Sequence, residues 1–310
     1  MSFGDFHGRQ AIRPNLRNNN RIFGRRASGC STLTRRSTHH DRFDKPGGRD
    51  HDLALGDYHR FARAALGELG SELVTACDIG PGTRVLDIGT GTGHVALAAA
   101  LSGAEVVTVD TDVDTCTACR AEALRREVDL EWARADAQDL PFPDSSFDIV
   151  VSSGSATFLP AHQDVADELL RVTKPGGVIG MTCWTRRSWI CEILATLAHY
   201  DPPAADALPA RLWSSKEHLL WLFGDRIADL DLTMHSFRRT APTPAQFIEF
   251  FETAFDPILT AFTAMADHPE RAAALHTDLL DLADRRNLAE PDRPAEYLFE
   301  YVVLTATAAT

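Results

Sequence analysis

Short apolar runs alternate with longer amphipathic stretches through the middle of the chain. Four runs, RVLDIG, EVVTVD, FDIVVSS and VIGMTCW, are apolar at consecutive positions. Such runs are typical of parallel strands that are buried on both faces. The stretches 94–102, 113–127 and 163–173 between them are helix-like. This alternation predicts an α/β fold with a doubly wound, mostly parallel sheet.

The pattern changes after Pro202. The run SKEHLLWLFGD predicts a short helix, and DLDLTMHSFRRT alternates apolar and polar positions like a strand. Thr243 followed by Pro244 is a helix-start signal, and the helix that it opens carries phenylalanines three and four residues apart. YLFEYVVLTATA predicts an antiparallel last strand. The region of about 241–292 is therefore expected to be a helical insertion before that strand.

The first 50 residues differ in composition from the rest. They hold eleven lysines and arginines against four aspartates, a net charge of +7, which leaves −20 on the rest because the whole chain carries −13. We expect residues 1–50 to be a basic, disordered arm, since they have little apolar periodicity. A transit peptide and an anchor for anionic surfaces are the alternatives for this arm. Residues 51–310 are expected to form one domain.

Charge and cysteine usage exclude several classes of function. An acidic body repels phosphate backbones, so no nucleic acid is expected as the main substrate. No apolar run approaches the roughly 20 residues of a membrane helix, and the chain lacks a signal-peptide core, which predicts a cytoplasmic protein. Cys116 and Cys119 form a CxxC without a second ligand pair, so no metal site is expected.

The candidate chemistry lies in the segment VLDIGTGTGH, where a buried strand ends at a glycine-rich turn that opens a helix. Glycines allow a tight turn and close approach of a ligand to the backbone. A dinucleotide-binding loop would place its third glycine at the position of His94. Asp87 would be unfavourable beside a pyrophosphate, whereas it suits a cationic ligand. The next strand ends at Asp110, which can accept hydrogen bonds from both hydroxyls of a ribose.

The joint order of four segments resembles the class I SAM-dependent methyltransferases. These are VLDIGTGTG, VVTVD, ADAQDLPFPDSSFDIVVS and ELLRVTKPGG, and within the class they are similar to the methyltransferases of ubiquinone and menaquinone biosynthesis (methyltransferase domain 11). The resemblance implies a Rossmann-like fold, S-adenosyl-L-methionine as cofactor and a small-molecule acceptor. It implies cofactor-binding roles for Asp87, Gly89, Gly91, Gly93, Asp110, Thr111, Asp136, Ala137, Ser152 and Ser153.

The resemblance also gives each of these residues a place against the cofactor. Asp87 is expected at the methionine end, and the three glycines under the methionine and ribose. Asp110 is expected to bind the ribose hydroxyls, with Thr111 beside the adenine and with Asp136 and Ala137 reading its edge. Ser152 and Ser153 end a strand whose backbone carbonyl is expected to face the methionine amine.

The acceptor and its chemistry are less constrained. The segment SGSAT, residues 153–157, replaces a bulkier segment of related enzymes and is expected to open the pocket beside the methyl group. A phenylalanine-rich cap favours a hydrophobic or aromatic acceptor. Catalytic residues stay unassigned, and Tyr58, His59 and His162 are the candidates for a general base. A nicotinamide oxidoreductase, an RNA-modifying enzyme that uses the basic arm, and a SAM-binding protein with non-methylating chemistry remain alternatives.

Overall fold

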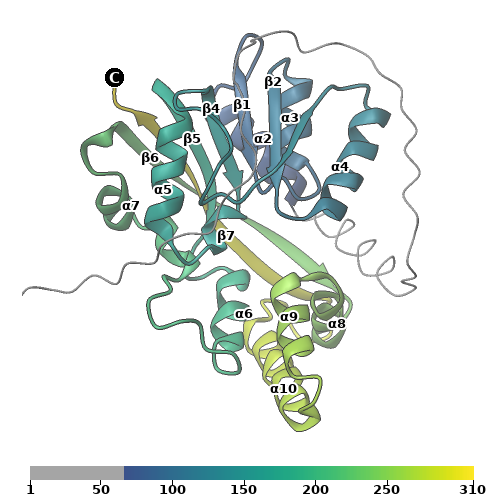
Figure 1. The fold of residues 1–310 in the computed structure, drawn as a ribbon. Coiled ribbons are helices and arrows are strands. Elements are labelled where there is room, and N and C mark those ends of the chain that lie inside the picture. Colours follow the sequence, from purple (N-terminus) through teal and green to yellow (C-terminus); the bar gives the residue numbers. More distant parts are fainter. Residues whose placement is uncertain (1–65) are drawn as a thin grey trace, which may run out of the picture. The chain divides into compact units, whose positions relative to one another are not determined.

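The computed structural model describes residues 66–310, so the basic arm and the candidates Tyr58 and His59 lie outside the described residues. One sheet of seven strands runs through this part in the order β3-β2-β1-β4-β5-β7-β6 (Figure 1). Strands β1 to β5 are parallel, and β7 is antiparallel to both β5 and β6. The strands are β1 (Arg84–Ile88), β2 (Glu105–Asp110), β3 (Glu131–Arg134), β4 (Phe147–Ser153), β5 (Thr173–Trp184), β6 (Ile227–Ala241) and β7 (Ala295–Ala308).

The helices agree with the predicted alternation and add one segment that the pattern did not indicate. That segment is α6 (Trp189–Leu197), after β5. The predicted insertion holds three helices between β6 and β7, namely α8 (Pro244–Ala254), α9 (Asp256–Ala264) and α10 (Pro269–Arg286). The others are α2 (Gly67–Ala76), α3 (His94–Leu101), α4 (Val113–Arg125), α5 (His162–Val172) and α7 (Lys216–Phe223), with short 3-10 turns η2 (Ala156–Phe158), η3 (Ala210–Ser214) and η4 (Gly224–Arg226).

Consecutive apolar residues bury both faces of the sheet because neighbouring side chains on a strand point to opposite sides. Val85 packs in one core cluster with α2 and α3, whereas its neighbour Leu86 packs in a second cluster with α5 and α7. The same alternation holds for Val106 and Val107 on β2. The doubly wound, Rossmann-like sheet expected from the apolar runs is thereby confirmed.

Strands β6 and β7 are long enough to leave the rest of the sheet. The last β5–β7 pair is Trp184 with Tyr301, but the β6–β7 pairing continues to Ala241 with Ala295. Because Trp184 ends β5, this two-stranded ribbon projects beyond the carboxyl ends of the parallel strands. Figure 1 shows the ribbon leading from the sheet to α8, α9 and α10. The insertion therefore stands on the side of the sheet where doubly wound folds bind their ligands.

Candidate functional site

Asp87 lies in the middle of the site, near the carboxyl end of the central strand β1. Its side chain is 1% exposed, and the hydroxyl of Thr90 donates to its Oδ2 over 2.8 Å. The pKa of Asp87 is raised to about 7, chiefly by burial; within this net shift the bond from Thr90 lowers the pKa and the negative charge of Asp110 raises it. A buried carboxylate of this kind is stabilised by a cationic ligand, since a nearby positive charge favours its ionised form.

The glycine loop after β1 depends on conformations that other residues adopt at a cost. Gly89, Gly91 and Gly93 all have positive φ, at 66°, 51° and 80°. A Cβ on Gly89 would lie 2.2 Å from the Cβ of Ser155, and one on Gly93 would lie 1.9 Å from the Sγ of Cys119. These glycines therefore allow the turn itself and its close packing against the segment after β4 and against α4.

Asp110 ends β2 and ties the glycine loop to the turn that follows. Its Oδ2 accepts from the backbone N–H of Gly91 over 3.0 Å, and its Oδ1 accepts from the N–H of Asp112 over 3.0 Å. An ionised carboxylate has about four lone-pair positions, so each oxygen can still accept a ribose hydroxyl. Thr111, the next residue, is exposed at the same edge.

Asp136 and Ala137 lie in the loop after β3, which is the next strand outward. The N–H of Gln138 donates to Asp136 Oδ1 over 2.9 Å, and the N–H of Ala135 donates to the Asp110 carbonyl over 3.2 Å. The side chain of Ala137 is buried, whereas Asp136 is exposed. The structure thus places this loop beside the end of β2, close to the residue expected to hold the ribose.

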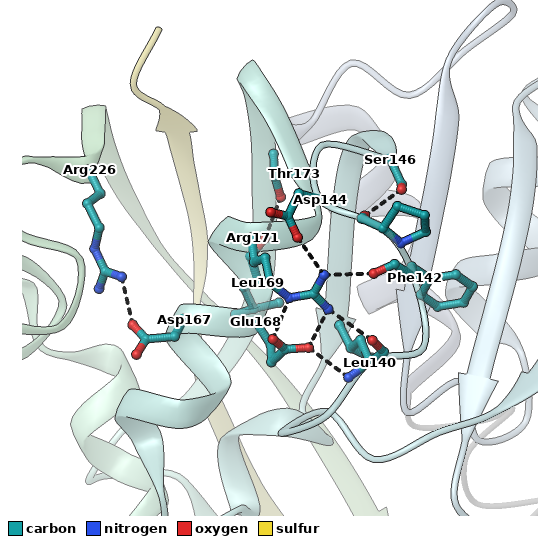
Figure 2. A network of polar contacts seen from close by, with 11 residues as sticks. Leu140, Phe142, Asp144, Ser146, Asp167, Glu168, Leu169, Arg171, Thr173 and Arg226 are labelled. Carbon is teal, nitrogen blue, oxygen red and sulfur yellow. Dashed lines mark hydrogen bonds and ion pairs between the residues drawn. The ribbon is translucent and has the colours of Figure 1, made fainter.

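A network on α5 supports this loop from behind (Figure 2). The Arg171 guanidinium donates to the carbonyls of Leu140 and Phe142 over 2.9 and 2.7 Å, and to Glu168. Glu168 in turn accepts from the N–H of Leu140 over 2.7 Å. The pKa of Glu168 is held below its ordinary value by its bond from Arg171. One helix thereby fixes the backbone that follows Asp136.

Ser152 and Ser153 end β4 with both hydroxyls occupied. Ser152 is completely buried, and its hydroxyl donates to the Ile88 carbonyl over 2.9 Å. The hydroxyls of Ser153 and Thr182 lie 2.9 Å apart and share a hydrogen bond. The hydroxyl of Ser155 donates to the Gly89 carbonyl over 2.8 Å. These bonds join β4 and the segment after it to β1 and β5.

The helical insertion reaches the same edge through Asp256, the first residue of α9. Asp256 is exposed, and its pKa is raised by partial desolvation and by the negative charges of Asp112 and Asp110. The start of α9 therefore lies on the side of the sheet where β2 ends. Asp256 was not among the predicted site residues, because the sequence does not tell which part of the insertion faces the strand ends.

The histidines near the site are neutral and enclosed. His162 begins α5, is 0% exposed, and its Nδ1 lies 2.9 Å from Nε2 of His218 on α7. Burial lowers the pKa of His162 to about 4, with His218 adding to the effect. Burial lowers the pKa of His94 to about 4 as well. An imidazole with such a pKa is a weak base, and no sequence signal indicated that His218 would pair with His162.

Comparisons with known proteins agree with this geometry. Residues 86–181 match the model of a methyltransferase domain family. The chain is 36% identical over 261 residues to the uncharacterized protein Rv1405c of Mycobacterium tuberculosis (strain H37Rv), covering 82% of this chain and 91% of that protein. The chain belongs to the class I SAM-dependent methyltransferases.

Two further comparisons cover a smaller part of this methyltransferase or have a lower sequence identity. Demethylmenaquinone methyltransferase of Beutenbergia cavernae is 38% identical over 138 residues, which is 44% of this chain and 52% of that enzyme. The solved structure of the YcgJ protein of Bacillus subtilis has the same fold, with a TM-score of 0.55 at 19% identity, over 78% of this chain and 99% of that chain.

The cofactor of the family is S-adenosyl-L-methionine, and the residues present fit it. Carboxylates lie at or just after the carboxyl ends of β1, β2 and β3, at Asp87, Asp110 and Asp136. This set of hydrogen-bond acceptors suits a ligand that has a positive charge at one end and hydrogen-bond donors on a ribose and an adenine at the other. Within residues 66–310, no group of side chains could hold a metal ion, and no helix has the length and apolar character of a membrane span.

Proposed function

We propose that this methyltransferase transfers the methyl group of S-adenosyl-L-methionine to a small hydrophobic or aromatic acceptor. The observation that carries the proposal is the β6–β7 ribbon, which holds an apolar helical insertion beyond the carboxyl ends of the strands. An apolar cap at this edge excludes water and selects acceptors by hydrophobic contact. The atom that is methylated, O, N or C, is left open.

We assign the methionine end of the cofactor to Asp87 and the glycines, and the nucleoside end to the next two strands. Asp87 is the buried carboxylate available to the ammonium group, and the backbone of Gly89, Gly91 and Gly93 forms the surface under the methionine and ribose. Asp110 receives the ribose hydroxyls. Asp136 and Ala137 face the adenine edge with Thr111 beside it, and the backbone of Ser152 and Ser153 borders the methionine.

Methyl transfer from this cofactor needs little general acid or base catalysis. The cofactor supplies a methyl group on a sulfonium, which is already activated for in-line displacement by a nucleophile. What the chain contributes is orientation of the two reactants and a site from which water is excluded. The carboxylates of Asp87 and Asp110 hold the cationic reactant, and the small residues after β4 leave room for the acceptor. His162 is enclosed and paired with His218, so we give it no role as a base.

The test is an assay of the purified full-length protein with labelled S-adenosyl-L-methionine. A panel of small phenols, hydroxyquinones and aromatic amines is offered, and release of S-adenosylhomocysteine is followed beside transfer of label. Transfer to an apolar aromatic acceptor supports the proposal. Cofactor binding with no transfer to any acceptor indicates a non-methylating SAM protein, and transfer to RNA alone indicates a nucleic-acid methyltransferase.

A further inference from the structure

We propose that Trp184 is an acceptor-binding residue whose indole N–H donates a hydrogen bond to an oxygen of the acceptor. Trp184 ends β5 at the carboxyl edge of the sheet, next to the end of β4. The inference rests on the proposed function, since it names a residue that selects the acceptor. It also narrows the substrate class to aromatic or conjugated compounds with a hydroxyl or carbonyl oxygen beside the methylated atom.

The indole nitrogen of Trp184 lies next to Gly154. A Cβ added at Gly154 would lie 3.5 Å from Nε1 of Trp184. Gly154 follows β4 directly, and the next residue, Ser155, donates to the Gly89 carbonyl in the glycine loop. The N–H therefore lies beside Gly154, at the start of the segment that joins β4 to η2. A larger side chain at position 154 would stand in front of it.

The indole N–H has no hydrogen-bond partner among residues 66–310. Trp184 is only 6% exposed, so the donor is largely removed from water. The indole nitrogens of Trp189 and Trp213 are also unpaired, but both are sealed inside the protein, whereas that of Trp184 is not. A donor that has lost most of its water and has no protein partner gains most from a ligand oxygen. A protonated amine cannot fill this role, because it has no lone pair.

Three aromatic rings behind Trp184 hold its orientation. Phe237, Phe299 and Tyr301 meet the indole edge to face, with ring centroids 6.4, 6.2 and 6.0 Å away. Tyr301 is itself held by a hydrogen bond from its hydroxyl to Glu72. The hydroxyl of Thr185, the residue after Trp184 in the chain, donates to Glu300 over 2.6 Å. The N–H is therefore aimed before a ligand binds, so little conformational entropy is lost on binding.

The direct test is NMR of the indole groups in protein labelled with nitrogen-15 at tryptophan and saturated with S-adenosylhomocysteine. The probes are 1-naphthol and naphthalene, which share their rings and differ in the oxygen. We expect 1-naphthol to move the Trp184 N–H signal downfield and naphthalene to move it much less, while the Trp213 signal stays in place. Equal shifts with both probes, no shift, or no binding of 1-naphthol would each overturn the proposal.

A variant pair provides the second measurement. Trp184→Phe assigns the signal and keeps an aromatic ring, and it should lower kcat/KM for a hydroxyarene acceptor by about tenfold, the effect of one lost hydrogen bond and part of a ring. Trp213→Phe, at a buried indole in the other core cluster, is the matched control and should leave kcat/KM unchanged at equal melting temperature. Calorimetry with S-adenosyl-L-methionine separates the two hypotheses. If the wild-type protein does not bind the cofactor, the proposed function is contradicted. If it binds the cofactor and both substitutions change kcat/KM equally, only the role of Trp184 is contradicted.

Discussion

At the scale of single residues, the protonation of Asp87 couples cofactor binding to pH. Burial raises its pKa to about 7, so below that pH the free protein holds a proton there, and a cationic cofactor favours the form without it. We expect affinity for S-adenosyl-L-methionine to rise with pH between about 5.5 and 7.5, with proton release on binding. Calorimetry in buffers of different ionisation enthalpy measures both. His94 and His162 do not interfere, since burial lowers the pKa of each to about 4.

The raised pKa of Asp87 also makes the stability of the cofactor-free protein depend on pH. Between about pH 4 and 7 the native state binds the Asp87 proton more tightly than the unfolded chain does, so the free energy of unfolding falls as pH rises through that range. Asp87→Asn should remove this slope and also abolish the proton release on cofactor binding. Proton release that persists in Asp87→Asn would show that another group is responsible.

Asp110 provides a second prediction at this scale. Replacing it with alanine removes the carboxylate that we assign to the ribose hydroxyls, and it also removes the acceptor of the Gly91 N–H. Asp110→Ala should weaken binding of S-adenosyl-L-methionine by about 1.5–3 kcal/mol, the range for hydrogen bonds to a charged group. Calorimetry measures the change, with the exposed Asp139→Asn as control. An unchanged affinity would mean that the ribose lies elsewhere.

At the scale of elements, α5 supports the loop after β3 through Arg171. Its guanidinium satisfies two loop carbonyls and pairs with Glu168, whose side chain is largely buried. Arg171→Met keeps the length of the stem but leaves these carbonyls and Glu168 without their donor. We expect a loss of about 2–4 kcal/mol in the free energy of unfolding, with weaker cofactor binding. Denaturant unfolding and calorimetry measure the two effects. Arg226→Met, which breaks an exposed pair with Asp167, is the control and should cost less than about 1 kcal/mol.

The phenylalanines of α8 serve first to pack the helix against the rest of the protein. Phe251 is 0% exposed and contacts the rings of Trp189, Phe247 and Phe299. We expect Phe251→Ala to cost about 3–5 kcal/mol of stability, as for other core phenylalanines, with cofactor affinity preserved in the fraction that folds. Chemical denaturation measures the loss. Phe250 on the same helix is partly exposed, and a decrease in acceptor affinity in Phe250→Ala without such a loss would support the cap as a substrate lid.

At the scale of the whole molecule, the long β6–β7 ribbon places Asp256 of the insertion on the side of the sheet where we expect the cofactor to bind. The negative charges of Asp112 and Asp110 raise the pKa of Asp256, so the three carboxylates together favour a cationic ligand. S-adenosyl-L-methionine carries a sulfonium that S-adenosylhomocysteine lacks. Asp256→Asn should therefore weaken the former more than the latter, narrowing their affinity ratio by on the order of threefold. Competition binding measures the ratio, with the exposed Asp281→Asn on α10 as control. An unchanged ratio would mean that the insertion does not contribute to cofactor choice.

The sequence by itself determined the parts of this protein that depend on local pattern. Consecutive apolar residues at 85–86, 106–107 and 149–151 specify strands buried on both faces, and the glycines of 89–93 specify a turn that other residues adopt only with strain. The parallel strands in turn bring Asp87, Asp110 and Asp136 to one edge, because each lies at or just after the carboxyl end of a strand that runs the same way. Fold, family and cofactor could therefore be predicted from residues close together in the chain.

The tertiary structure alone decided which distant residues meet at that edge. The separation of Gly154 and Trp184 along the chain gives no sign that an indole N–H faces the space after β4. Nothing in the sequence of α9 indicates that Asp256 approaches β2, since this depends on how far the β6–β7 ribbon continues past β5. The pairing of His162 with His218 likewise follows from the packing of α5 on α7. Such contacts depend on register and on packing across the sheet, which the periodicity of a single segment does not encode.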